Sequence, residues 1–184
     1  AAKALTTRVG FSPFIGLDFG LGGYYSPYDE KGEKNVGLVV ADFNYRLGPL
    51  ELLGEGGLAF FDPVTLKDKD GKETGKLLGP MLGYYLEAHY HLFPEFLQFT
   101  FLGMDFTNPV FTLFTRFDQV DTNLGQLNEN DRTQLTFGLN YRPVPNAAFK
   151  LEYQWNLENM AILTGDFSKE KANNQFLASL AVGY

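Results

Sequence analysis

Residues 173–184 read NNQFLASLAVGY, and in this stretch large apolar residues alternate with small or polar ones up to a terminal aromatic residue. Successive side chains of a β-strand point to opposite faces. One face would therefore carry Phe176, Ala178, Leu180, Val182 and Tyr184, and the other would carry Gln175, Leu177, Ser179, Ala181 and Gly183. Because the same alternation recurs upstream, the sequence predicts an all-β protein built from antiparallel strands.

Nine segments in all show this pattern. The eight that precede residues 173–184 are 3–11, 15–25, 36–46, 50–61, 77–92, 110–120, 132–142 and 148–157. Short turns are expected at Ser12–Pro13, Gly48–Pro49 and Pro143–Asn146, and they alternate with long polar loops near 28–35, 62–75, 122–131 and 159–172. Short turns at one end and longer loops at the other are typical of outer-membrane barrels. Residues 93–109 break this rule, and we expect this Phe-rich segment to be an insertion at the short-turn rim, with an extra hairpin as the alternative.

Composition narrows the class of protein. Hydrophobic residues make up 45% and aromatic residues 16% of the chain, yet the mean hydropathy is only -0.16 because polar residues are interleaved with apolar ones. The longest apolar runs are far shorter than the roughly 18 residues that a membrane-spanning helix needs, so only a closed β-barrel could span a membrane. The absence of cysteine removes disulfides and thiolate chemistry, and the net charge of -7 argues against nucleic acid as a partner.

The amount of apolar side chain decides which face of the strands points outward. A soluble barrel of the lipocalin type would turn its apolar face inward. Roughly four or five large apolar residues on each strand exceed what the narrow interior of a barrel of about eight strands can hold. We therefore predict one transmembrane β-barrel domain over residues 1–184, with its apolar face toward lipid. The candidate residues of its aromatic belt are Tyr25, Tyr45, Tyr90, Tyr141 and Tyr184.

The opposite face of the strands carries charges of both signs. These charges predict either an ion-pair network that plugs a narrow barrel or a water-filled pore crossed by a transverse electric field, and the pore is favoured. The predicted pore-lining residues are Arg8, Asp18, Asp42, Arg46, Glu51, Glu55, Glu87, His89, Arg116, Asp118, Arg132, Arg142, Lys150 and Glu152.

Five phrases of the sequence resemble, in order, hairpins of Gram-negative porins of the phosphate-selective (O and P) type. They are VGFSPFIGLDFGLGGYY at 9–25, VADFNYRLGPLELLGEG at 40–56, YYLEAHYHLFP at 84–94, FTRFDQVDTN at 114–123 and FGLNYRPVPNAAFKLEYQ at 137–154. The resemblance covers most of the chain and implies a trimeric channel of roughly sixteen strands, of which this chain would supply the C-terminal portion. The chain has no lysine cluster of the kind that a phosphate-selective pore needs.

The function predicted from these features is an outer-membrane, porin-like channel for passive diffusion of small hydrophilic solutes or ions. The rival hypothesis is a structural outer-membrane barrel that anchors or encloses a partner protein without transport. The expected partners are membrane lipid, lipopolysaccharide and two further copies in a homotrimer. The closing strand also resembles the last strand of outer-membrane barrels, which is read by the barrel assembly machinery.

Residues that could carry chemistry are few. His89 and His91 share a strand face with Glu87, but three candidate ligands in one row are a weak metal pattern, and side chains that wet the channel wall are the favoured interpretation. Residues 68–71, DKDG, lack the remaining oxygens of a calcium loop, so a polar loop is expected. The glycines of 20–23 are expected to leave room for a close neighbour or a strand bend. No nucleophile and base are arranged as in an enzyme, so the sequence predicts no enzyme, no cofactor and no metal.

The odd number of strands leads to a further expectation. Bacterial single-chain barrels have an even number of strands and keep both termini in the periplasm. Here the alternation of turns and loops would place Tyr184 in the periplasm and Ala1 on the extracellular side. An unpaired strand edge in lipid exposes backbone groups at a cost of several kcal/mol each. We therefore expect strands upstream of Ala1, or another chain, to close the barrel.

Overall fold

Nine strands of the chain form one antiparallel sheet. The structure, a computed structural model, describes residues 3–29, 31–77, 79–124, 131–158 and 173–183. The strands follow one another in the order β1-β2-β3-β4-β7-β8-β9-β10-β11, and each pairs with the next. Their bounds are β1 Leu5–Phe14, β2 Leu17–Pro27, β3 Asn35–Leu47, β4 Leu50–Phe61, β7 Met81–Leu92, β8 Val110–Asp121, β9 Asp131–Val144, β10 Ala147–Glu158 and β11 Gln175–Val182. The nine predicted antiparallel strands are thereby confirmed.

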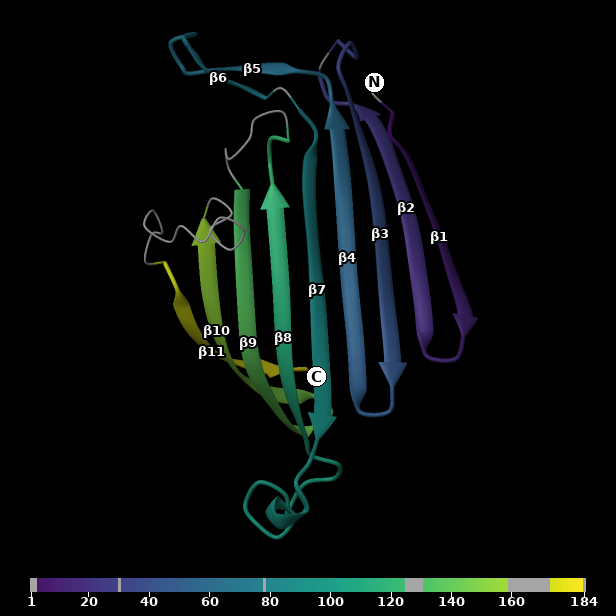
Figure 1. Cartoon of the computed structure of the whole chain (residues 1–184), viewed down its shortest axis with the longest axis vertical. Helices are drawn as coiled ribbons and strands as arrows, with labels where there is room; N and C mark the ends of the chain where they lie inside the picture. Colours follow the sequence, from purple (N-terminus) through teal and green to yellow (C-terminus); the bar gives the residue numbers. More distant parts are fainter. Residues whose placement is uncertain (1–2, 30, 78, 125–130, 159–172, 184) are drawn as a thin grey trace.

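The sheet is a curved, open meander (Figure 1). β1 and β11 are its two edges, and every described residue of these two strands is exposed. The short turns between β1 and β2, β3 and β4, and β9 and β10 lie at one end of the strands, and the longer connections gather mainly at the other. Gly48 has a φ of 57°, which a glycine adopts at little cost, and it allows the tight turn from β3 to β4. No helix in the described part of the chain is long and apolar enough to cross a membrane.

Among the described residues, two connections contain secondary structure of their own. The connection from β4 to β7 contains a separate two-stranded hairpin, β5 (Val64–Lys67) and β6 (Glu73–Leu77), at the long-loop end. Residues 93–109, all described, form turns and the short 3-10 helix η1 (Glu95–Leu97) at the short-turn end. The hidden strand considered for 93–109 is therefore wrong, whereas the placement of this segment as an insertion at the short-turn rim is confirmed.

The structure corrects three predicted boundaries. The first turn lies at Ile15–Gly16 and not at Ser12–Pro13, because β1 continues to Phe14 through an irregularity in its pairing between Phe11 and Phe14. Proline has no N–H to donate, and an edge strand with a bulge tolerates it. The strand predicted from 77 begins at Met81, since Leu77 belongs to β6. The polar loop predicted for 62–75 contains most of the β5–β6 hairpin.

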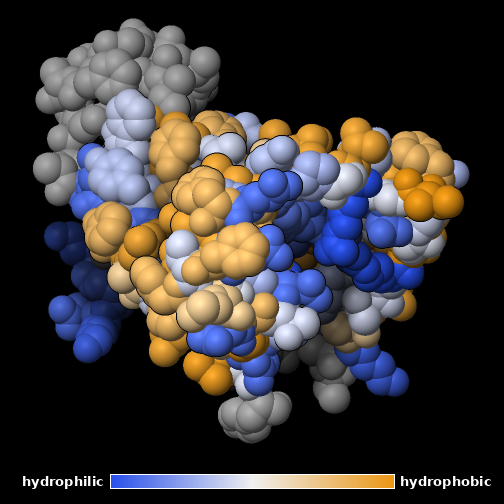
Figure 2. All heavy atoms as spheres, turned by 90° about the horizontal axis from the view of Figure 1, so that it is seen from below, coloured by the Kyte–Doolittle hydropathy of each residue, from blue (hydrophilic) through white to orange (hydrophobic). Residues whose placement is uncertain are grey.

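Paired residues of neighbouring strands lie on the same face, so the alternation within each strand gives the whole sheet two distinct faces. We call the face that bears Asp42, Glu55 and Asp118, with their neighbours in register, the polar face. The apolar face bears rows such as Leu50, Tyr90, Leu113, Leu139 and Leu151. Figure 2, which looks from below, shows hydrophilic residues gathered inside the curve and hydrophobic residues along much of its outer margin.

Burial in this sheet is the reverse of that in a soluble protein. Leu157 is the only buried hydrophobic side chain among the described residues. On the polar face, by contrast, the residues Glu51 and Thr136 are buried, at 9% and 3% exposure. On the apolar face Leu86 and Leu113 are about half exposed, at 51% and 50%. The described residues therefore form no conventional apolar core, and none of them builds a second layer over the apolar face.

Candidate functional site

The charged side chains of the polar face form the candidate site. The strand pairing puts all fourteen predicted pore-lining residues on this one face. Ion pairs join some of them, namely Arg8 to Asp42, Arg46 to Glu51, and Arg116 to both Glu87 and Asp118. His89 lies close to both Glu51 and Glu87. Among the described residues no ion pair involves the other six members, Asp18, Glu55, Arg132, Arg142, Lys150 and Glu152.

The pair formed by Arg8 and Asp42 depends on a glycine between them. Arg8 on β1 reaches across β2 to Asp42 on β3, where Nη2 lies 2.7 Å from the Asp42 Oδ2. A Cβ added to Gly20 would lie 2.4 Å from both Arg8 Nη2 and Asp42 Oδ2. The expectation that this glycine leaves room for a close neighbour is therefore confirmed.

Arg116 on β8 contacts two carboxylates and an aromatic ring. Its guanidinium donates to Asp118 over 2.6–2.9 Å and lies 3.6 Å from a Glu87 oxygen. The guanidinium carbon also stands 4.0 Å from the centre of the Tyr85 ring, in a cation–π arrangement. One cation thus bridges two carboxylates on neighbouring strands.

Replacing Arg116 with leucine is expected to lower the free energy of unfolding by about 1–2 kcal/mol, because the carboxylates of Glu87 and Asp118 lose their shared cation. Urea titration of the protein in lipid vesicles measures this loss. Arg8→Leu is the matched control: its side chain is 62% exposed on an edge strand, and its loss should cost less than about 1 kcal/mol. An Arg8 variant that is the more destabilised of the two would contradict this assignment.

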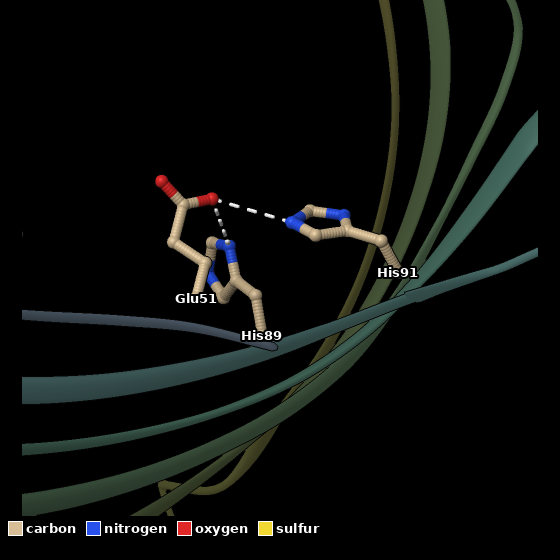
Figure 3. Close-up of side chains that lie close together, drawn as sticks. All are labelled: Glu51, His89 and His91. Carbon is tan, nitrogen blue, oxygen red and sulfur yellow. Dashed lines mark hydrogen bonds and ion pairs between the residues drawn. The ribbon is translucent and has the colours of Figure 1, made fainter. Parts of the chain in front are cut away.

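Glu51 brings the two histidines together near the short-turn end of the polar face (Figure 3). Its Oε1 accepts hydrogen bonds from Arg46 Nε (2.7 Å) and Asn44 Nδ2 (3.0 Å). Its Oε2 faces both rings, 3.3 Å from His91 Nε2 and 3.8 Å from His89 Nδ1. Residues from β3, β4 and β7 therefore converge on a single carboxylate.

The other nitrogen of each ring has a partner as well. His89 Nε2 lies 2.8 Å from Glu87 Oε1, and His91 Nδ1 lies 2.8 Å from Thr112 Oγ1. The sequence pattern grouped the histidines with Glu87 alone and missed Glu51, which lies directly opposite His89 in the β4–β7 pairing. No local pattern could have revealed this, because residues 62–80 separate the two strands.

The long-loop end of the sheet is held by polar contacts of its own. Tyr28 Oη donates to the Asp62 carbonyl (2.9 Å) and so links the β2–β3 connection to the end of β4. The Lys34 N–H donates to Asp29 Oδ1 (2.9 Å), and this hydrogen bond lowers the pKa of the Asp29 carboxyl. At the tip of the β5–β6 hairpin, Asp68 Oδ1 accepts from the backbone N–H groups of Asp70 and Lys72, as expected for a polar turn.

The apolar face carries aromatic contacts near the short turns. Phe111, Tyr141 and Phe149 stack in sequence across β8, β9 and β10, with ring centres 4.6 Å and 6.4 Å apart. Phe93 extends this row, with its ring centre 5.9 Å from that of Phe111. Tyr141 also donates a hydrogen bond to the Leu102 carbonyl, which ties the 93–109 insertion to the sheet. The belt candidate Tyr184 lies outside the described residues.

Comparison with known proteins adds no relative: no family model, no curated protein and no solved structure matches this chain. The resemblance to the phosphate-selective porins therefore stays a prediction from the sequence.

Proposed function

We propose that this chain forms part of the wall of an outer-membrane β-barrel, a porin-like channel through which small hydrophilic solutes or ions diffuse. The observation that supports this proposal is that polar residues are buried in the sheet while large apolar residues are exposed. A single sheet that exposes its large apolar side chains on one face, and has Leu157 as its one buried hydrophobic residue among those described, cannot obtain enough hydrophobic stabilisation in water. Lipid in contact with the apolar face supplies the missing stabilisation, because it removes these side chains from water.

The dimensions of the sheet support a membrane location. A tilted transmembrane strand needs about 9–11 residues to cross the hydrocarbon core. Eight of the nine strands have 10–14 residues, and β11 has 8 among the described positions. The stacked ring of Tyr141 and its aromatic neighbours stands at the end of the strands, where aromatic belts meet the headgroups.

The two edge strands of the open sheet, β1 and β11, need hydrogen-bonding partners in a membrane. An unpaired strand edge in lipid would leave N–H and C=O groups without partners. In this proposal β1 and β11 therefore pair with further β-strands, and the enlarged barrel encloses an aqueous lumen. The expected partners are lipid and lipopolysaccharide on the apolar face, two further copies in a trimer, and the assembly machinery at the C-terminal strand.

The charges of the polar face favour a pore over a plug. Taken together, the charged members on β2, β3, β4 and β7 are acidic apart from Arg46 and His89. On β8, β9 and β10 together the four cations Arg116, Arg132, Arg142 and Lys150 outnumber the two carboxylates of Asp118 and Glu152. Opposite signs on different sectors of a wall create a transverse field that acts on polar solutes passing through it. Several of these charges, Arg132, Arg142 and Lys150 among them, have no ion-pair partner among the described residues and are available to a solute or to water.

A planar-bilayer recording tests the proposal. The natural protein, extracted in detergent and added to a bilayer, is expected to produce stable, stepwise single-channel currents. The control is the same preparation after heat denaturation, which should be silent. Silence from a folded, heat-modifiable barrel would contradict the channel and favour the rival hypothesis of a barrel that anchors or encloses a partner protein.

A further inference from the structure

We propose that Glu51, His89 and His91 form a binding site for a divalent transition-metal ion, with Zn²⁺ as the ion that best fits the donors. This site goes beyond the proposed channel and does not depend on it, because the three side chains belong to two paired strands of the same sheet. Among the described residues, this is the one group of three side chains whose donor atoms all lie close enough together to hold such an ion.

The distances between the donor atoms suit a small ion. In a tetrahedral zinc site, ligand bonds of about 2.0–2.1 Å place neighbouring donors about 3.3 Å apart. Glu51 Oε2 lies 3.3 Å from His91 Nε2 and 3.8 Å from His89 Nδ1, and all three donors fall within 4.8 Å of one another. Two imidazoles and one carboxylate are a known zinc ligand set that leaves a fourth position open for water or a solute.

The hydrogen bond of His89 to Glu87 leaves the other ring nitrogen facing Glu51. When His89 Nε2 carries the proton donated to Glu87 Oε1, the neutral ring presents the lone pair of Nδ1 toward Glu51 Oε2. Two lone pairs that face each other at 3.8 Å repel, and either a proton on Nδ1 or a metal ion bound between the two atoms relieves that repulsion. A metal ion removes this repulsion and gives each donor a bond.

The surrounding groups match those that orient metal ligands in proteins. Histidine ligands usually donate their second N–H to a carboxylate or another oxygen acceptor, which sets the tautomer. Glu87 plays this part for His89, and Thr112 Oγ1 can accept from His91 Nδ1. Arg46 and Asn44 occupy Glu51 Oε1, which leaves Oε2 as the single oxygen directed at the histidines. Glu51 itself is 9% exposed, so its orientation is restrained by burial as well.

Calorimetry with Zn²⁺ tests the site. The full-length protein, folded in detergent and treated with a chelator, is expected to bind one Zn²⁺ ion at this site at neutral pH. His91→Gln and Glu51→Gln should each weaken that binding at least about tenfold, and Glu87→Gln, which removes an orienting carboxylate, should weaken it about tenfold. Copper(II) added in place of zinc should show imidazole nitrogen coupling in its electron paramagnetic resonance spectrum, and His91→Gln should reduce that coupling.

Glu55→Gln is the matched control, because Glu55 lies on the same strand and face but outside the cluster. It should bind Zn²⁺ as tightly as the unmodified protein. Heat-modifiable gel mobility verifies folding, and if Glu51→Gln fails to fold, His91→Gln decides the question. Absence of saturable binding, or equal affinity in the His91→Gln variant and the unmodified protein, would overturn the metal site. Neither result would bear on the bilayer currents, so failure of the site and failure of the channel are distinguishable.

Discussion

Replacing Leu151 with arginine is expected to cost about 2–4 kcal/mol of folding free energy in a bilayer if this position lies near the midplane. Leu151 sits in the middle of β10 on the apolar face, between Leu139 of β9 and Ala178 of β11. A guanidinium at this position would have to lie in hydrocarbon or pull water into it. Denaturant titration of the protein folded into lipid vesicles measures the cost.

The control for Leu151→Arg is Gln154→Arg, three residues along the same strand. Gln154 belongs to the polar face, where it pairs with Thr136 on one side and Gln175 on the other. A charge there meets polar neighbours and water, so the cost should be well under about 1 kcal/mol. Equal costs at the two positions would show that the apolar face does not meet lipid.

Gly138→Ala is expected to destabilise the sheet by about 1–3 kcal/mol. The ring of Phe114 lies over Gly138, and an added Cβ would fall 2.1 Å from Phe114 Cε1 and 2.3 Å from Phe114 Cζ. The ring also contacts His89 edge to face, with centres 5.6 Å apart, so it cannot retreat without disturbing that residue. Urea titration of the purified variants in lipid vesicles measures the loss.

Two further variants isolate the steric cause. In a Phe114→Ala background the additional cost of Gly138→Ala should disappear, because the clashing ring is gone. Gly22→Ala, also on the polar face, should be tolerated, since its nearest neighbour would be the Thr7 carbonyl oxygen at 3.6 Å. A Gly138 penalty that persists without the Phe114 ring would assign the effect to the backbone.

The alternation of side chains was sufficient to predict several features of the fold. It identified nine antiparallel strands and the polar and apolar faces, and it placed the tight turn at Gly48–Pro49. Each of these is a local property, because the side chains of a strand alternate with a period of two whatever the strand pairs with. Membrane insertion, the lumen and transport follow from the same pattern only as proposals.

Pairing between strands far apart in the chain is a tertiary property, and only the structure decided it. The register of β4 against β7 places Glu51 opposite His89, across a connection that contains the separate β5–β6 hairpin. A shift of one residue would move Glu51 to the other face, and a shift of two would separate it from both rings. The packing of Phe114 over Gly138 and the passage of the Arg8 side chain over Gly20 depend on register in the same way. The alternation therefore determined which face each side chain occupies, whereas pairing across the sheet decided which side chains meet.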